Sequence, residues 1–407
     1  MTVPIQDYPH MRDLPLHLKK VLLRVDYNVP LGEQGEIVDD WRIQKSLPSL
    51  MYALEQGSAI VLISHLGRPE GKVSPSLSLK VCAKRLSSLI PYPVFFCNSC
   101  TGEEVKERIQ KLLPGEVLVL ENLRFHPEEE NPHLNVKFAK ELSEGCDYFV
   151  NDAFGALHRY HSSITELPKY FPQKAAMGFL VEEEVRVFQT LLRAPKKPFH
   201  VIIGGNKVSS KMGILHALLN HVSDLFIGGG MALTFLKAKQ LETSSSSVDP
   251  KQLQQALDLM HLCQETKTVI HLPCDLVIAN QKEKGALFKT ITLPTSIPEG
   301  WMGLDIGPLT LEAWKEPLKN ASTIFWNGPL GVFEIPPFDQ GTNKLAQILS
   351  SQDCPKIIGG GDSVAAIQKA SLSSSFNHLS TGGGASLAYL EQQSLPGLDA
   401  LLASCAP

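Results

Sequence analysis

Short apolar runs that stop abruptly at glycine or at a charged residue recur along this chain, and a longer amphipathic stretch follows most of them. The runs begin near residues 21, 59, 116, 147, 200, 224, 322, 356 and 378. Continuous apolar runs of this length are typical of parallel strands that are buried on both faces. Strands that alternate with helices predict an α/β fold with Rossmann-like, doubly wound parallel sheets. Because ligands of such sheets bind beyond the carboxyl ends of the strands, we expect the chemistry where the runs end.

The composition limits the number of domains and the classes of partner. A length of 407 residues predicts two domains. Lys and Arg total 38 against 42 acidic residues, so no global positive charge favours nucleic acid. The sequence contains no apolar run long enough to cross a membrane, and its start lacks the pattern of a secretion signal. We therefore expect a cytoplasmic protein whose eight cysteines are reduced.

The segment 181–198 separates two halves with different residues at the ends of the apolar runs. Val181, Val185, Phe188 and Leu192 recur at helical spacing, and the prolines of APKKP end that helix. Before this segment the runs end in charged side chains, and after it they end in glycines. We therefore predict domains at 1–180 and 199–390, with 181–198 as an interdomain helix and hinge.

Glycine clusters follow the apolar runs of the second half, at 204–205, 228–230, 359–361 and 382–384. Glycine between a strand and a helix lets backbone N–H groups approach a phosphate, and the helix N-terminus adds partial positive charge. The alternative is that each cluster marks only a tight turn. None of the clusters completes GxxxxGK[ST] or GxGxxG, so the pattern predicts a nucleotide site of another design.

Charged residues beside these clusters are candidate ligands of a nucleotide and its metal. Lys207 and Lys211 lie four residues apart at the start of a predicted helix, where both ammonium groups would share one face. Asp362 would be a magnesium ligand, and Glu334 would accept hydrogen bonds from a ribose. The alternatives are a solvated face for the lysines, a helix N-cap for Asp362 and a surface loop for Glu334.

Arginines lie at or just after the runs of the first half, at positions 24, 42, 68, 124 and 159, with His65 and His161 nearby. The planar guanidinium group binds carboxylate and phosphate through paired hydrogen bonds. A single arginine of this kind is usually a surface ion pair. Several around one crevice repel one another unless an anion is bound there, so we expect a small, doubly anionic substrate.

The pair Cys97 and Cys100 offers a competing prediction, a thiol-disulfide redox centre. Thr101 and Glu104 have the spacing of a capping box, which would place the start of the next helix after both cysteines. This arrangement favours two ordinary reduced thiols. A zinc site would need a second close pair, and the other cysteines do not form one.

A resemblance that spans nearly the whole chain joins these motifs. RVDYNVP, DDWRI, SHLGRP, ENLRFHPEEE, NDAFGALHR, GGNKVSSKMG, IGGGMALTFLKA, MGLDIGP, WNGPLGVFE, GGGDSVAA and STGGGASL resemble the successive signature blocks of the phosphoglycerate kinase family. The resemblance implies two doubly wound domains facing each other across a hinged cleft, in a monomer. It also implies that the tail 391–407 returns to the N-terminal domain.

By this resemblance the N-terminal domain binds 3-phosphoglycerate or 1,3-bisphosphoglycerate, and the C-terminal domain binds ADP or ATP with Mg²⁺. The implied phosphoglycerate ligands are Asp26, Asn28, Arg42, His65, Leu66, Gly67, Arg68, Arg124 and Arg159. The implied nucleotide ligands are Lys211, Gly228, Gly229, Gly303, Asn327, Glu334, Gly360, Gly361, Asp362 and Ser363, with Asp362 on the metal. Arg42, Lys207 and Lys211 are the expected catalytic residues of a direct, in-line phosphoryl transfer.

The chain departs from the family pattern at Asn206 and Ser210, where alanine and aspartate are usual, and at Ala388, where an acidic residue is usual. We expect altered loop packing from the first two and an altered detail of domain closure from the third. A catalytically silent binding protein is the remaining alternative. It would lack a lysine or arginine of the blocks above, and none is missing.

Overall fold

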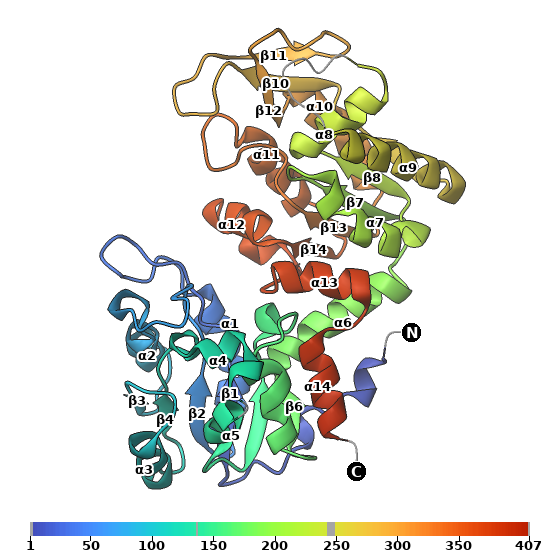
Figure 1. Ribbon diagram of the computed structural model, residues 1–407. Coiled ribbons are helices and arrows are strands. Elements are labelled where there is room, and N and C mark those ends of the chain that lie inside the picture. Colours follow the sequence, from blue (N-terminus) through green and yellow to red (C-terminus); the bar gives the residue numbers. More distant parts are fainter. Residues whose placement is uncertain (1–2, 136, 242–248, 406–407) are drawn as a thin grey trace. The chain divides into compact units, whose positions relative to one another are not determined.

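The computed structural model describes residues 3–135, 137–241 and 249–405 (Figure 1). The chain divides into two compact units, of which the first comprises Met1–Arg186 with Gln392–Pro407 and the second Val187–Glu391. The division at residues 186 and 187 falls inside helix α6 (Phe179–Arg193). The boundaries expected at 180, 198 and 390 stay predictions.

The first unit contains a six-stranded sheet in the order β3-β4-β2-β1-β5-β6. Every neighbouring pair of strands is parallel, so all six carboxyl ends lie at one edge. The strands are β1 (Lys20–Arg24), β2 (Ala59–Ile63), β3 (Val94–Phe96), β4 (Val117–Val119), β5 (Tyr148–Asn151) and β6 (Ala175–Met177). All residues of β2 and β4 are buried, as continuous apolar runs predict.

Helices connect these strands, and one apolar core lies between them and the sheet. The helices are α1 (Trp41–Glu55), α2 (Lys80–Ser87), α3 (Glu103–Lys111), α4 (Pro127–Glu130) and α5 (Lys137–Ser143). Leu50 and Leu54 of α1 pack with Leu23 of β1 and Leu62 of β2 in that core. The central strands are thereby fixed under α1, which also carries Arg42 in its first turn.

The second unit repeats the parallel design with the strand order β15-β14-β13-β7-β8-β9. Its strands are β7 (Phe199–Ile203), β8 (Asp224–Ile227), β9 (Val269–His271), β13 (Thr323–Asn327), β14 (Lys356–Gly359) and β15 (His378–Leu379). Its helices are α7 (Met212–Leu218), α8 (Gly229–Ala238), α9 (Pro250–Thr266), α10 (Pro308–Lys319), α11 (Gln340–Ser350), α12 (Gly361–Lys369) and α13 (Gly384–Gln392). All neighbouring strands are again parallel. The expected fold class is confirmed.

A three-stranded antiparallel sheet in the second unit was not expected. It consists of β10 (Asp275–Ala279), β11 (Phe288–Thr292) and β12 (Met302–Ile306), with β10 in the middle. Four of the five residues of β11 are exposed, so the sequence there has no continuous apolar run. Continuous apolar runs therefore do not predict β11, and the run LVIA of the largely buried β10 was not recognised as a strand.

Two amphipathic patterns in the sequence differ in their outcome. The pattern that begins at Val181 predicts a helix, and α6 (Phe179–Arg193) confirms it. A second helix is predicted by the helical spacing of Met212, Leu215, Leu218, Leu219 and Val222. Helix α7 confirms it from Met212 to Leu218, and a single 3₁₀ turn follows to His221. Helical spacing does not distinguish these two kinds of turn.

The last helix, α14 (Pro396–Ser404), packs within the first unit (Figure 1). Gly397 N donates a hydrogen bond to Leu157 O at 3.0 Å, and Gln173 N donates one to Ser404 O at 2.7 Å. A Cβ atom on Gly397 would lie 2.6 Å from a methyl group of Leu157, so the helix approaches that loop closely. Among the described residues, no helix is both long and apolar enough to span a membrane.

Asp305 of β12 predicts a pH-dependent stability for the second unit. The side chain is buried and accepts hydrogen bonds from Gly341 N at 2.6 Å and Ile306 N at 2.9 Å. Burial raises the pKa of Asp305 to about 8, and the two backbone hydrogen bonds only partly oppose it. Because this folded pKa exceeds the ordinary value of 3.8, the protonated form stabilises the fold. That contribution is complete below about pH 4 and is lost as the pH rises towards 8.

We expect Asp305→Asn to remove this dependence, which amounts to at most about 1.4 kcal/mol per pH unit in that range. Denaturant unfolding of both proteins at several pH values measures it. The matched control is Asp258→Asn, because Asp258 is exposed on α9. Parallel pH profiles for Asp305→Asn and the unchanged protein would contradict the prediction.

Candidate functional site

Asp26 follows β1 and lies beside side chains from two other segments of the first unit and beside the backbone of its own loop. Its Oδ2 accepts a hydrogen bond from Arg42 Nη1 at 2.5 Å, and its Oδ1 accepts one from Asn28 N at 3.2 Å. His65 Nδ1, at the end of β2, lies 4.0 Å from Oδ1. Three of the residues expected to bind phosphoglycerate therefore meet at Asp26.

Charge determines the protonation state of this carboxylate. Burial by itself would raise the pKa of Asp26, but the neighbouring basic groups, the Arg42 guanidinium first, outweigh burial and lower the pKa to about 2. Asp26 is therefore ionised at neutral pH and balances the Arg42 guanidinium. Arg42 is only half-buried, so part of it stays accessible to a ligand.

The loop that follows β2 is held by two amide side chains. Asn28 Oδ1 accepts from Gly67 N at 2.9 Å, and Asn122 binds both backbone atoms of Leu66, accepting from its N at 3.2 Å and donating to its O at 2.7 Å. Arg124 Nη1 donates to Gly67 O at 2.8 Å. The expected ligands Asn28, Leu66, Gly67 and Arg124 therefore belong to one connected loop network.

Internal carboxylates pair with three of the arginines found at the strand ends. Arg42 pairs with Asp26, Arg124 Nε lies 3.2 Å from Glu130 Oε1, and the fully buried Arg24 lies 4.0 Å from the fully buried Glu129. Sequence analysis did not single out Glu129 and Glu130, although the run PEEE directly follows ENLRFH. These pairs lower the repulsion that several arginines would otherwise cause.

Two further arginines remain open to solvent. Arg68 and Arg159 are exposed, and neither makes an ion pair with another residue in the described ranges. Arg159 follows Leu157, the residue that α14 contacts through Gly397. Leu157 is completely buried, so the C-terminal helix fixes the base of the loop that presents Arg159.

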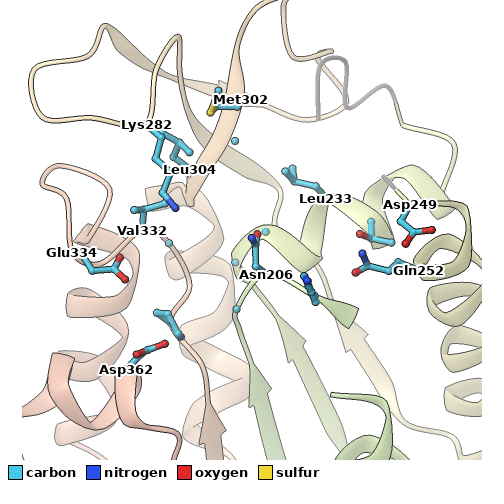
Figure 2. A pocket seen from close by; sticks show the side chains of 18 residues that line it. Asn206, Leu233, Asp249, Gln252, Lys282, Met302, Leu304, Val332, Glu334 and Asp362 are labelled. Atoms are coloured by element: carbon cyan, nitrogen blue, oxygen red, sulfur yellow. The ribbon is translucent and has the colours of Figure 1, made fainter. Parts of the chain in front are cut away.

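A pocket of about 560 Å³ lies within the second unit (Figure 2). Its lining residues come from loops that follow strands, from the first turns of α8, α9 and α12, and from β12 and the loop after β10. They are Gly205, Asn206, Lys207, Gly229, Gly230, Leu233, Thr234, Asp249, Gln252, Lys282, Met302, Gly303, Leu304, Pro329, Gly331, Val332, Glu334 and Asp362. In Figure 2 Met302 and Lys282 lie at one end and Asp362 lies at the other.

Lys207, Gly229, Gly303, Glu334 and Asp362 are the residues of the sequence prediction that line this pocket. Glu334 and Asp362 are both exposed, as accessible ligands would be.

The other residues expected at the nucleotide lie outside the pocket lining. They are Lys211, Gly228, Asn327, Gly360, Gly361 and Ser363. Lys211 Nζ donates a hydrogen bond to Asn327 Oδ1, and Ser363 Oγ accepts from Gly328 N at 2.7 Å. The buried Nδ2 of Asn327 has no partner in the described parts of the chain, and a Cβ atom on Gly360 would lie 3.1 Å from it. An unpaired donor therefore faces the start of α12.

The expected helical face shared by Lys207 and Lys211 is wrong. Lys207 has extended backbone angles, a 3₁₀ turn spans Val208–Ser210, and α7 begins only at Met212. Lys207 is exposed in the pocket, whereas Lys211 is half-buried. Burial lowers the pKa of Lys211, and the charge of Asp362 opposes this change. The two ammonium groups thus occupy different environments.

Backbone contacts at the strand ends leave no room for side chains. A Cβ atom on Gly204 would lie 2.1 Å from Pro329 O, and one on Gly229 would lie 2.6 Å from Gly205 N. Gly229 also has φ +68°, a conformation that residues with a Cβ atom rarely adopt. Asn206 Oδ1 fills the space beside Gly230, where a Cβ atom would lie 2.2 Å from it. Glycine is therefore required for packing as well as for ligand access.

Side chains from the unexpected sheet supply the apolar wall of the pocket. Met302 and Leu304 of β12 line it, together with Leu233 of α8 and Val332. Gly303, which lies between Met302 and Leu304, was expected from the sequence, whereas its two neighbours were not. Alternation along β12 could have found them only if that strand had been recognised.

Asp362 is not the N-cap of α12. The N-cap is Gly360, which has φ +88°, and Asp362 is the second residue of the helix. A carboxylate there is favoured by the helix dipole and remains exposed in the pocket. In the described part of the chain, no three His, Cys, Asp or Glu side chains form a metal-binding group.

The two cysteines of the competing redox prediction are free and buried. Burial raises the pKa of both the Cys97 and the Cys100 thiol, and Cys100 Sγ donates to Glu121 O at 2.8 Å. Helix α3 begins at Glu103 with Gly102 as its N-cap, so it starts after both cysteines, although Thr101 does not cap it. Protonated, buried thiols do not favour redox chemistry.

Comparisons with known proteins agree with this geometry. The family model described as Phosphoglycerate kinase matches residues 11–393. A phosphoglycerate kinase of Pseudothermotoga lettingae is 44% identical over 388 residues, which cover 95% of this chain and 97% of the relative. That of Moorella thermoacetica is 46% identical over 391 residues, which cover 96% and 98%.

Solved structures are similar over the same extent. The structure of phosphoglycerate kinase from Coxiella burnetii has a TM-score of 0.83 at 35% identity and covers 98% of this chain and 100% of that chain. The enzyme from Pyrococcus horikoshii OT3 has a TM-score of 0.84 at 31% identity, with coverages of 97% and 98%.

The glycine contacts predict a large effect of one methyl group. We expect Gly229→Ala to destabilise the second unit by roughly 1–3 kcal/mol, because it combines a strained φ with a clash against backbone atoms. Thermal and denaturant unfolding measure this change. Gly361→Ala is the matched control, since a Cβ atom there meets nothing within 4 Å. Equal losses of stability in the two variants would refute the packing argument.

Proposed function

The chain belongs to the phosphoglycerate kinase family, and we propose that its first unit binds the phosphoglycerate and its second unit binds the nucleotide. Its activity is the reversible transfer of a phosphoryl group between 1,3-bisphosphoglycerate and ADP, which yields 3-phosphoglycerate and ATP in glycolysis. The observation that supports the nucleotide assignment best is the pocket that exposes glycine backbone, Lys207 and Asp362 to one space of about 560 Å³.

The phosphoglycerate ligands proposed for the first unit are Asp26, Asn28, Arg42, His65, Leu66, Gly67, Arg68, Arg124 and Arg159. Arg68 and Arg159 are exposed cations without an internal ion pair in the described ranges, so an anionic substrate can supply their counter-charge. Arg42 and Arg124 are already oriented by carboxylates, so little side-chain entropy is lost when they bind.

The nucleotide ligands proposed for the second unit are Lys211, Gly228, Gly229, Gly303, Asn327, Glu334, Gly360, Gly361, Asp362 and Ser363. The unpaired Asn327 Nδ2 beside Gly360 supports a phosphate at the start of α12, because phosphate oxygens accept hydrogen bonds. The apolar wall of Leu233, Met302 and Leu304 suits the flat face of a base.

Arg42, Lys207 and Lys211 are the proposed catalytic residues of a direct, in-line transfer without a covalent enzyme intermediate. The transferred group carries its negative charge on equatorial oxygens, so catalysis is mainly positioning and charge stabilisation. Arg42 keeps a fixed guanidinium through Asp26. Lys211 is held by Asn327, whereas the exposed Lys207 is free to follow the group that moves.

Mg²⁺ is the metal that we propose to accompany the nucleotide. Magnesium accepts one or two carboxylates together with phosphate oxygens, and the exposed Asp362 carboxylate in the pocket fits that donor set. When bound, the ion would neutralise phosphate charge during the transfer. Asp362 would hold it from the first turn of α12.

We further propose a monomeric, cytoplasmic enzyme in which 181–198 is the hinge and closure excludes water during transfer. The proposed domains are 1–180 and 199–390, with the tail 391–407 bracing the first. Light scattering of the purified protein tests the oligomeric state directly.

A coupled assay tests the function and the nucleotide site together. We expect NADH loss that requires 3-phosphoglycerate, ATP and Mg²⁺, in the presence of excess glyceraldehyde-3-phosphate dehydrogenase, and that stops on addition of a chelator. Lys211→Ala should lower kcat/KM roughly 100-fold or more, because a cation oriented towards phosphate is removed. Lys369→Ala, an exposed lysine at the end of α12, should retain full activity. Equal activity of the two variants would remove Lys211 from the site.

Arg42→Ala tests the substrate side of the same reaction. We expect kcat to fall by about three orders of magnitude or more, as for other arginines that stabilise a phosphoryl group in transfer. Arg85→Ala is the control, because Arg85 also pairs with a carboxylate, that of Asp40, but on the surface. If kcat survives in Arg42→Ala and only the KM for 3-phosphoglycerate rises, Arg42 is a binding residue and not a catalytic one.

A further inference from the structure

His65 lies at the end of β2 with its two ring nitrogens in different surroundings. Nδ1 faces the interior, where Arg24 Nη2 lies 3.2 Å away and Asp26 Oδ1 lies 4.0 Å away. Nε2 has no hydrogen-bond partner among the described residues, and the side chain is only 8% exposed. One nitrogen is therefore bound by the protein, and the other is left for a ligand.

The partner of Nδ1 can only donate. A guanidinium group carries five N–H donors, has no acceptor and stays protonated at any pH at which proteins are folded. A hydrogen bond from Arg24 Nη2 therefore requires a lone pair on Nδ1. Neutral imidazole has one N–H group, so the proton must then be on Nε2.

The competing arrangement would place the proton on Nδ1 and direct it towards Asp26. The distance of 4.0 Å from Nδ1 to Asp26 Oδ1 is too long for a hydrogen bond, and Asp26 already accepts from Arg42 and from Asn28 N. The charged groups that face His65 are Asp26, Arg24, Arg42 and Arg124. Burial first, and then the arginines, lower the pKa of His65 well below 6.5, against the opposing charge of Asp26.

Hydrogen bonds from the other two nitrogens of its guanidinium group fix Arg24 in this orientation. Its Nε donates to Ser163 Oγ at 3.0 Å, and Nη1 donates to Val25 O. Ser163 Oγ in turn donates to Glu129 Oε1 at 2.6 Å, and Ser163 N donates to Glu129 Oε2 at 3.0 Å. Arg24, Ser163 and Glu129 are each completely buried, so solvent cannot compete for these bonds.

We propose that Arg24 is a positioning residue that holds His65 as the neutral Nε2–H tautomer, so that His65 offers a fixed hydrogen-bond donor to the anionic substrate. The proposal rests on the function proposed above only in naming phosphoglycerate as that anion. It gives the buried Arg24 a role distinct from that of the arginines that would touch the substrate. It also means that His65 recognises its ligand without carrying charge.

Nitrogen-15 NMR of the imidazole rings in the substrate-free protein tests the tautomer, with the signal assigned by its absence in His65→Gln. We expect Nδ1 to resonate as an unprotonated nitrogen and Nε2 as a protonated one, unchanged between pH 6 and pH 8. A proton on Nδ1, or a ring protonated on both nitrogens at pH 7, overturns the proposal. This spectrum of the unaltered protein decides the question whether or not any variant of Arg24 folds.

Two variants separate positioning from structural support. Arg24→Met removes the donor, so His65 should show a mixture of tautomers, and the KM for 3-phosphoglycerate should rise roughly 10-fold while that for ATP stays unchanged. Glu129→Gln disturbs the buried ion pair behind Arg24 but leaves the donor in place. It should lower stability and leave the His65 tautomer as it is. A changed tautomer in Glu129→Gln with an unchanged one in Arg24→Met would refute the assignment.

Substitution of His65 itself tests the use of Nε2. The amide nitrogen of glutamine can replace Nε2–H, whereas that of asparagine reaches only the position of Nδ1. His65→Gln should therefore keep a KM for 3-phosphoglycerate lower than that of His65→Asn, by roughly 10-fold. If both variants bind 3-phosphoglycerate like the unaltered protein while NMR still shows Nε2–H, the substrate assignment fails and the tautomer assignment stands.

Discussion

Parallel pairing in both large sheets is the constraint on which each candidate site depends. All strands of a parallel sheet end at the same edge, so whatever follows them in sequence is collected there. The first unit collects Asp26, His65 and the loop around Gly67, and the second collects glycine backbone and Asn327. One topology thus produces a site built mainly from charged side chains and another in which glycine backbone, charged groups and an apolar wall line one pocket.

Arginines gathered at one edge of a sheet repel one another, and carboxylates of the first unit neutralise some of them but not all. Arg24, Arg42 and Arg124 have carboxylate neighbours within the fold, whereas Arg68 and Arg159 are exposed. The paired arginines keep their positions without a ligand, whereas the exposed arginines have no internal counter-charge in the described ranges and can bind an anion. In the second unit, Asn327 binds Lys211 through Oδ1 and keeps Nδ2 as a donor that carries no charge.

The sequence predicted the fold class, the central strands and the glycine-rich helix starts, because continuous apolar runs and glycine clusters reflect local requirements. Lys207, Glu334 and Asp362, singled out beside the glycine clusters, and Gly303, implied by the family resemblance, all line one pocket. The sequence missed Glu129, since a buried carboxylate in an acidic surface run is recognised only when its arginine partner is located in space. It misjudged Lys207 and Lys211, because helical spacing was assumed where a 3₁₀ turn intervenes. Met302 and Leu304 were missed with the short antiparallel sheet that holds them.

The return of the last residues to the first unit has a consequence for how the protein is made. During synthesis the N-terminus of a chain leaves the ribosome first, and most domains can fold as soon as all of their own residues have emerged. Here the loop that presents Arg159 rests on Gly397, so the first unit lacks part of its packing until residues beyond the second unit have been synthesised. The second unit, continuous from Val187 to Glu391, has all its residues earlier. The half that begins first is therefore completed last, and a truncated translation product would carry a finished second unit beside an unfinished first one.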